Sequence, residues 1–212
     1  MKRIIITIDG PAASGKGTIA KYIKNKFNYF HIDSGILYRK IAKILFDHKV
    51  NIKNYKELAS FIKNINDMDA ANKRGLRSTH ISKISSEIAK INLIRNFVNL
   101  NQRKIVKKCP KKYRGIVIDG RDIGSVVFKN AQIKLYIITN PTIRAKRRYK
   151  ELIDLGEKTI YSNVLKEIKL RDKKDKNRKN SPLIIPKGAI IINNSNSLYK
   201  TKKIINQIID KR

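Results

Sequence analysis

A glycine-rich loop, placed between a short apolar run and a helical pattern, limits the folds open to this chain more than any other segment. The apolar run is Ile4–Ile8. The loop comprises Gly10, Pro11, Ala12, Ala13, Ser14, Gly15, Lys16, Gly17 and Thr18. In such a strand–loop–helix unit the backbone N–H groups and the positive end of the helix face an anion, and the lysine reaches the β and γ phosphates. The pattern therefore predicts that the whole loop binds a nucleoside triphosphate, with Lys16 in a catalytic role.

The loop differs from the commonest phosphate-binding loops at one position. Gly17 stands where a hydroxyl side chain would normally ligate magnesium, and Thr18 comes one residue later. We therefore expect no direct protein ligand for the metal. Thr18 is assigned to nucleotide binding only.

Composition allows two interpretations of a strongly basic surface. The 212 residues are enough for one domain, and 49 Lys and Arg against 16 Asp and Glu give a net charge of +33. Such a charge attracts polyanions. However, Lys, Ile and Asn recur along the whole chain, as drift in an AT-rich coding sequence would produce, and no RNP-type, zinc-finger or helix-turn-helix signature is found. We interpret the charge as a solvated surface, with specific nucleic-acid binding as the alternative.

The remaining composition bears on compartment and assembly. Cys109 is the only cysteine, which excludes an intramolecular disulfide, and no apolar run approaches the length that spans a membrane. We therefore expect a cytoplasmic protein without membrane association. We also expect it to be a monomer.

Apolar runs and helical patterns alternate along the chain. The expected strands are Ile4–Asp9, Tyr29–Asp33, Gly115–Asp119, Gln132–Thr139 and Ala189–Asn193, with a helix through Phe27 and another around Ile36–Phe46. Strands without polar alternation are typical of a parallel sheet covered by helices on both faces. The pattern predicts an α/β, doubly wound fold with its site at the carboxyl ends of the strands.

Acidic residues follow three of these strands. Asp9, Asp33 and Asp119 end their strands and could orient magnesium-bound waters. For Asp33 an N-terminal helix cap is the alternative. The sequence leaves both roles open.

Four separated motifs together resemble the bacterial cytidylate kinases, a branch of the nucleoside monophosphate kinases. They are the phosphate loop, Asp33–Arg39, Asp119–Gly124 with Val126–Phe128, and Arg171–Arg178, and the resemblance runs from Ile4 to about Leu183. It implies a transferase that phosphorylates CMP and dCMP with ATP and Mg²⁺ in pyrimidine nucleotide metabolism. It also implies a P-loop nucleoside monophosphate kinase fold, a parallel sheet flanked by helices, in a single domain over 1–212. The monophosphate-binding insert with its adjoining helices would span about 51–109, and the lid about 142–178.

The chemistry of such a transfer calls for cations rather than for a strong base. The second phosphate pKa of a monophosphate is about 6, so the acceptor oxygen is mostly deprotonated at neutral pH. Catalysis then reduces to alignment and charge neutralisation. The resemblance assigns Arg39, Arg77 and Arg121 to the acceptor phosphate, and Arg147 and Arg148 to closure over the phosphates, so that Lys16, Arg121, Arg147 and Arg148 form the catalytic set. For each arginine alone, a solvated surface charge is the alternative.

Recognition of base and sugar needs donors and acceptors. By the same resemblance, Ser34, Arg95, Asp122 and Arg178 surround cytosine, Ser86, Arg171 and Asp175 approach the ribose, and Tyr38 belongs to the substrate site. An aspartate accepts a hydrogen bond from the cytosine amine, whereas arginine donates to O2 and N3. The i, i+4 spacing of Arg171 and Asp175 also suits a surface ion pair.

The chain departs from the family pattern in two places. The stretch from Asn51 to Arg77 is short, and residues 65–74 lack strand alternation, so we expect a shortened monophosphate-binding insert. Ala13 replaces a glycine that is usual in the loop, and we expect its φ to remain negative.

Two rival functions remain at this point. One is another small-molecule P-loop kinase, acting on AMP, UMP or a non-nucleotide acceptor. The other is a basic nucleic-acid-binding protein that uses its P-loop as a regulatory switch.

Overall fold

The computed structural model describes residues 3–65 and 75–210. The chain forms two compact units, one made of Met1–His31 and Lys111–Arg212 and the other of Ile32–Pro110. The predicted insert of about 51–109 falls within the second unit, and most of the stretch predicted to lack strands, residues 66–74, lies outside the described residues. No helix in the described part of the chain is long and apolar enough to cross a membrane.

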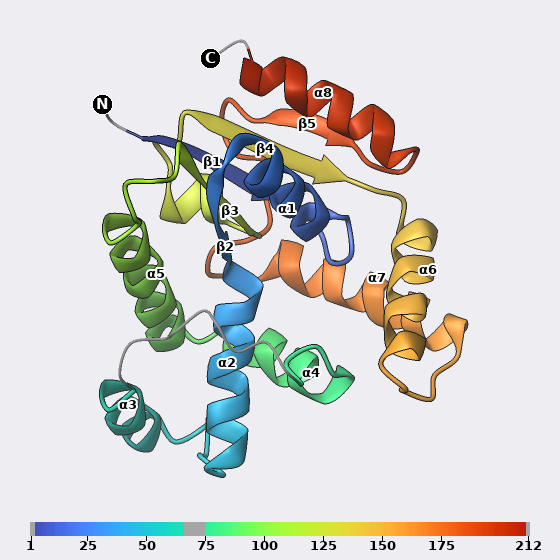
Figure 1. Ribbon diagram of the computed structural model, residues 1–212. Helices are drawn as coiled ribbons and strands as arrows, with labels where there is room; N and C mark the ends of the chain where they lie inside the picture. Colours follow the sequence, from blue (N-terminus) through green and yellow to red (C-terminus); the bar gives the residue numbers. More distant parts are fainter. Residues whose placement is uncertain (1–2, 66–74, 211–212) are drawn as a thin grey trace. The chain divides into compact units, whose positions relative to one another are not determined.

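Strands and helices alternate as the apolar pattern predicts (Figure 1). The elements are β1 (Ile4–Asp9), α1 (Lys16–Phe27), β2 (Tyr29–Asp33), α2 (Ser34–Asp47), α3 (Tyr55–Lys63), α4 (Thr79–Ile88), α5 (Asn92–Lys107), β3 (Gly115–Gly120), the π-helical turn η1 (Ile123–Val127), β4 (Ile133–Ile138), α6 (Pro141–Asp154), α7 (Tyr161–Asn177), β5 (Ile190–Asn193) and α8 (Leu198–Asp210). Each predicted strand is confirmed with ends shifted by one residue at most, as are the helices expected through Phe27 and around Ile36–Phe46.

The five strands form one sheet in the order β2-β3-β1-β4-β5. β1 pairs in parallel with β3 and with β4, and β4 pairs in parallel with β5. Asp9 lies opposite Gly120 in the β1–β3 register, so the polar ends of these two strands meet at one edge of the sheet. The predicted parallel α/β architecture is thus confirmed.

Residues of β1 alternate between an apolar face and a polar face of the sheet. Ile6 and Ile8 are fully buried in an apolar core that also holds side chains of α1 and α8, such as Ile23 and Ile205. Thr7 and Asp9 point to the opposite face, where Asp9 contacts the backbone of η1. One face therefore anchors the helices, and the other carries polar chemistry at its carboxyl end.

Helices α6 and α7, which occupy the region predicted as a lid, pack against each other through a small apolar cluster. Ala145 and Leu152 from α6 meet Val164 and Ile168 from α7, and all four are buried. Ala13 of the phosphate loop packs against the same cluster. The loop is therefore in apolar contact with this helix pair.

The second unit is helical in its described residues apart from the end of β2. α2 begins directly after Asp33, whose carboxylate accepts a hydrogen bond from the Ile36 N–H at 3.0 Å. This confirms the capping alternative for Asp33. α2 packs against α4 and α5, and α3 packs against α5. Asn54 and Ser78 cap α3 and α4 in the same way as Asp33 caps α2.

Candidate active site

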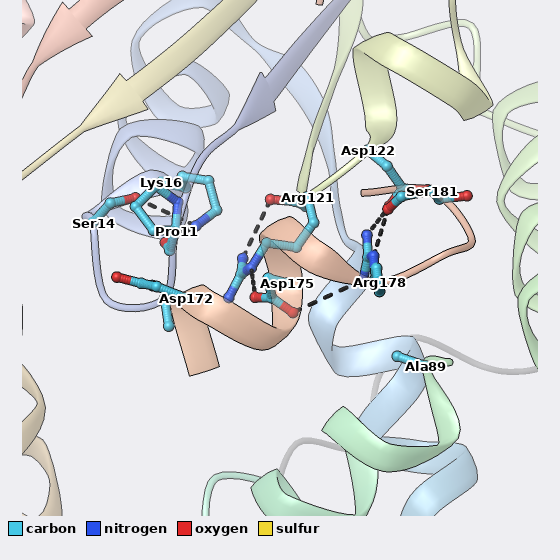
Figure 2. Close-up of polar contacts among 12 residues, drawn as sticks. Pro11, Ser14, Lys16, Ala89, Arg121, Asp122, Asp172, Asp175, Arg178 and Ser181 are labelled. Atoms are coloured by element: carbon cyan, nitrogen blue, oxygen red, sulfur yellow. Dashed lines mark hydrogen bonds and ion pairs between the residues drawn. The ribbon is translucent and has the colours of Figure 1, made fainter. Parts of the chain in front are cut away.

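The phosphate loop ends where α1 begins, and its lysine is directed back into the loop. Lys16 Nζ donates to the Pro11 carbonyl at 2.6 Å and to Ser14 Oγ at 3.3 Å (Figure 2). Only 5% of the Lys16 surface is exposed. Burial, and then the nearby Arg121, lower the pKa of Lys16 well below its ordinary value. A bound polyphosphate would oppose both effects, because an adjacent anion favours the ammonium form.

Ala13 departs from the expectation of a negative φ. Its φ is +56°, in the left-handed region, so that expectation is wrong. An L-residue with a Cβ pays roughly 1–2 kcal/mol for this conformation. Packing of the Ala13 methyl against the α6–α7 cluster offsets part of this cost.

Two side chains at strand ends hold one carbonyl of the loop, that of Ser14. The Ser14 carbonyl accepts from Thr139 Oγ1 at 3.1 Å and from Asn194 Nδ2 at 2.8 Å. Thr139 directly follows β4, and Asn194 directly follows β5. Any side chain at Gly15, whose φ is +92°, would overlap the Asn194 amide, which explains the glycine at this position.

A buried arginine ties the loop to α7. Arg144, at 2% exposure, donates from Nη1 to the Ala12 carbonyl at 3.2 Å and from Nε to the Thr139 carbonyl at 2.9 Å. Its two terminal nitrogens also pair with both carboxylate oxygens of Asp172 on α7, at 3.0 and 2.5 Å. This paired geometry suits the planar guanidinium of arginine. One side chain thereby connects the phosphate loop, the end of β4 and α7.

The two arginines predicted to close over the phosphates lie in different surroundings. Arg147 donates to the Asn194 carbonyl at 2.9 Å and to the Ser14 carbonyl at 3.5 Å, so it lies against the phosphate loop. Burial lowers the pKa of Arg147. Arg148 instead pairs with Glu151 on its own helix at 2.8 Å. The structure therefore brings Arg147 to the loop and joins Arg148 to α6.

Arg121 and Arg178 share a buried carboxylate on α7 (Figure 2). Arg121 Nε lies 3.0 Å from Asp175 Oδ2, and Arg178 Nη1 lies 3.9 Å from Asp175 Oδ1. Burial alone would raise the pKa of Asp175, but Arg121, Arg171 and Arg178 outweigh it and lower that pKa. Asp175 is 7% exposed, which argues against the surface ion pair that the spacing of positions 171 and 175 had left open.

Arg178 also reaches the carboxylate predicted to recognise the base. Its Nη2 lies 3.5 Å from Asp122 Oδ1, and its Nε donates to the Ser181 carbonyl (Figure 2). Asp122 is 5% exposed. The structure therefore places four predicted substrate residues, Arg121, Asp122, Asp175 and Arg178, in one connected cluster.

Asp9 holds the backbone that follows Asp122. Its two oxygens accept from the N–H groups of Ile123 and Gly124 at 2.8 and 2.7 Å, and these residues begin the turn that follows Asp122. A Cβ at Gly124 would lie 2.7 Å from Thr7 Oγ1, so glycine is required for this approach. Burial raises the pKa of Asp9 to about 6, although the two backbone donors act in the opposite direction.

Asp119 is oriented by a histidine that the motifs do not include. His31 Nε2 lies 2.7 Å from Asp119 Oδ1. The other oxygen, Oδ2, lies 3.9 Å from the position that a Cβ of Gly17 would occupy. One oxygen of Asp119 thus faces the loop position where other P-loops carry a metal-ligating hydroxyl.

In the second unit, two predicted phosphate arginines gather at the start of α2. Arg77 Nη2 lies 3.7 Å from Asp33 Oδ2. A Cβ at Gly35 would lie 3.3 Å from both Arg39 Nη1 and Asp33 Oδ1, so Arg39 also lies beside this turn. Arg77 is exposed and Arg39 is half-buried. Together with the helix N-terminus, this arrangement is typical of an anion site.

The remaining predicted residues of the second unit lie on α2, α4 and α5. Buried Ser34 Oγ accepts from Gln102 Nε2 at 2.7 Å. Arg95 Nη1 donates to the Ala89 carbonyl at 2.9 Å, and its guanidinium lies 5.9 Å from the centre of the Tyr38 ring. Ser86 lies on α4 and is half-buried.

Several residues of these networks were not assigned to the site from the sequence. They include His31, Gln102, Thr139, Arg144, Asp172 and Asn194. A signal existed for Thr139 and Asn194, because polar residues that follow parallel strands lie at the edge where sites form. Arg144 had none, since it stands among other basic residues of α6.

No group of three or more His, Cys, Asp or Glu side chains converges on a metal-binding geometry in residues 3–65 and 75–210. The described side chains therefore include no ready-made metal cage. An oxygen of Asp119 lies 3.9 Å from the position that a Cβ of Gly17 would occupy, where other P-loops carry a metal-ligating hydroxyl.

Comparison with known proteins identifies relatives for nearly the whole chain. Residues 6–212 match the cytidylate kinase family. A cytidylate kinase of Fusobacterium nucleatum is 40% identical over 208 residues, which cover 92% of this chain and 92% of that protein. A cytidylate kinase of Bartonella tribocorum is 37% identical over 211 residues, covering 99% of this chain and 96% of that protein.

Solved structures show likeness in fold. A shikimate kinase from Bacteroides thetaiotaomicron superposes with a TM-score of 0.54 at 10% identity, covering 99% of each chain. At that identity the likeness concerns the fold alone. It agrees with the parallel sheet and the phosphate loop described above.

The left-handed conformation of Ala13 leads to a stability prediction. Ala13→Val should lower the free energy of unfolding by about 2 kcal/mol or more, because a β-branched residue is strongly disfavoured at positive φ. Ala13→Gly should change it by less than about 1 kcal/mol, since relief of strain and loss of the methyl contact oppose each other. Urea unfolding of the two variants measures both values, and equal tolerance of valine and glycine would contradict the assigned backbone.

Asp9 should make folding stability depend on pH in an unusual direction. Its pKa of about 6 in the folded protein exceeds its ordinary value of 3.8, so the folded state binds this proton more tightly than the unfolded state does. The resulting stabilisation is fully present below the unfolded pKa and is lost as the pH rises through the folded pKa.

The Asp9→Asn variant isolates this contribution, because all other carboxyl groups are common to both proteins. The stability of the wild type relative to this variant should fall by roughly 2–3 kcal/mol between pH 4 and pH 7. Denaturant titrations at a series of pH values provide the measurement. A difference that does not vary with pH would show that Asp9 titrates normally.

Proposed function

The chain belongs to the cytidylate kinase family, and on that premise we propose how its residues transfer a phosphoryl group from ATP to CMP or dCMP. It is a nucleoside monophosphate kinase. The observation that carries the proposal is the cluster of Arg121, Asp122, Asp175 and Arg178, whose charges also act on Lys16 of the phosphate loop.

We assign the triphosphate of ATP to the loop from Gly10 to Thr18. Thr139, Asn194 and Arg144 hold carbonyls of the loop, so its N–H groups remain for the phosphates. Phosphate oxygens would replace the Pro11 carbonyl and Ser14 hydroxyl as acceptors for Lys16. Their charge would also restore a fully cationic lysine at this buried position.

Mg²⁺ fits the residues near Gly17 as a water-mediated ion. Asp119 Oδ2 faces this position, while His31 fixes the other oxygen of the same carboxylate. Asp119 would hold a water of the bound ion, and the ion would supply charge neutralisation for the phosphates. Asp9 is engaged by two backbone donors and Asp33 caps α2, so we assign Asp119 the principal role toward metal-bound water.

The acceptor phosphate is assigned to the start of α2. Arg39 and Arg77 flank this turn, and the N-terminal end of α2 adds partial positive charge. Planar guanidinium groups can bind phosphate oxygens in pairs, which orients the nucleophilic oxygen. The family resemblance assigns Arg121 to the same phosphate, and within its own unit Asp175 positions the Arg121 guanidinium.

The phosphoryl group in transfer is stabilised best by cations that already lie in position before the reaction. Arg121 is held by Asp175, and Arg147 by the carbonyls of Asn194 and Ser14. Arg148 would have to leave Glu151 to join them. We therefore place Arg147 closer to the reacting phosphates than Arg148.

By the family resemblance, recognition of cytidine is assigned to buried polar groups. Asp122 accepts from the cytosine amine, and Arg178 and Arg95 are available as donors to its acceptor atoms. Ser34 and Tyr38 contribute from α2. Asp175, Arg171 and Ser86 are assigned to the ribose.

We further propose that the enzyme is a cytoplasmic monomer that uses small-molecule nucleotides and has no specific nucleic-acid partner. The dispersal of Lys and Arg along the sequence supports this, because a dedicated nucleic-acid surface gathers them into one patch. Any RNA binding that rests on net charge alone should weaken steeply with salt, as counterion release requires.

Replacement of the loop lysine tests whether turnover belongs to this site. Lys16→Ala should lower kcat/KM for CMP at least roughly a hundredfold, because a charge that stabilises the transferring phosphoryl group is lost. Lys21→Ala, at an exposed position of the same helix, is the matched control and should keep wild-type kinetics. Coupled ADP release and a melting curve of each variant give the result. Retention of more than about a tenth of the activity by folded Lys16→Ala would rule out this loop as the site.

A further inference from the structure

A buried glutamine on α5 holds the hydroxyl of Ser34 and leaves its own carbonyl oxygen without a partner. Gln102 is 0% exposed, and its Nε2 donates to Ser34 Oγ at 2.7 Å. Its Oε1 is buried and has no hydrogen-bond partner among residues 3–65 and 75–210. A buried acceptor in this state costs about 1–3 kcal/mol.

The neighbouring buried residue of α5, Asn101, directs its amide differently. Asn101 is also buried, at 4% exposure, but its amide donates to the Phe97 carbonyl of the same helix at 2.9 Å. The Gln102 amide instead leaves its helix to reach the first residue of α2. Its direction is thus toward the residue already assigned to the base.

The contact fixes how Ser34 can act. Since Ser34 Oγ accepts from the Gln102 amide, its own O–H is left to donate elsewhere. The two side chains then present one donor, the Ser34 O–H, beside one acceptor, the Gln102 Oε1. A ligand that meets both must offer an acceptor next to a donor.

We propose that Gln102 is a specificity-determining residue that, together with Ser34, selects cytosine over uracil. Cytosine carries the ring acceptor N3 next to the 4-amino donor, which complements the Ser34–Gln102 pair. Uracil carries N3–H next to the O4 acceptor, which reverses both groups and places like against like. The inference rests on the proposed function, because it assumes that the base of the acceptor nucleotide reaches Ser34.

Gln102→Met removes both polar atoms while nearly preserving shape, and Asn101→Met is the matched control on the same helix. Steady-state kinetics with CMP and UMP, and the rise in Tm that each nucleotide causes without ATP, provide two readouts. In Gln102→Met the ratio of kcat/KM for CMP to that for UMP should fall roughly tenfold to a hundredfold. The reason is that the variant loses hydrogen-bonding groups that complement cytosine and do not complement uracil. The Tm rise caused by CMP should shrink, whereas Asn101→Met should keep both the ratio and the Tm rise.

Two outcomes would overturn the inference. One is a folded Gln102→Met whose CMP to UMP ratio matches the wild type; the other is an equal loss with both nucleotides, which indicates a structural role. If Gln102→Met does not fold, Ser34→Ala provides the test, because loss of the donor should also lower the ratio of CMP to UMP. An unchanged ratio in Ser34→Ala would show that the Ser34–Gln102 pair does not select the base. A wild-type enzyme that fails to phosphorylate CMP contradicts the proposed function itself, which separates the two failures.

Discussion

The fixation of the phosphate loop by its carbonyl groups is the constraint on which the site depends. Ser14 and Ala12 direct their carbonyls to Thr139, Asn194 and Arg144, so these two loop acceptors are satisfied by the scaffold. The loop N–H groups are then oriented before any anion arrives, which is the source of electrostatic preorganisation. Because Arg144 also grips Asp172, the same contacts connect the loop to α7.

The site must also hold several positively charged arginines close together when no phosphate is bound between them. Asp175 meets this requirement by lying among Arg121, Arg171 and Arg178. Its lowered pKa indicates that it remains ionised, since the arginines outweigh the effect of burial. Asp9 performs a different task, because its two oxygens accept from the backbone N–H groups of Ile123 and Gly124 at the start of η1. The two carboxylates thus stabilise charge and backbone separately.

Much of this arrangement could be predicted from the sequence, and the exceptions have physical causes. Apolar runs such as Ile116–Ile118 predict buried strands directly, and a strand-end Asp before a helix predicts the Asp33 cap. The φ of Ala13 could not be predicted, because tertiary contacts of the loop decide it rather than the side chain. The difference between Arg147 and Arg148 depends on which face of α6 meets the loop. Gln102 stands among polar residues of α5, and only the packing of α5 on α2 distinguishes it.

The rate of ADP release with a panel of monophosphates tests whether the site selects cytidine nucleotides. We expect CMP and dCMP to be phosphorylated with kcat/KM at least roughly tenfold above the values for UMP and AMP, since the buried donors and acceptors complement cytosine. The nucleotide products, CDP and dCDP, should appear in step with ADP. Equal turnover of UMP or AMP, or ADP release without a diphosphate product from CMP, would contradict this expectation.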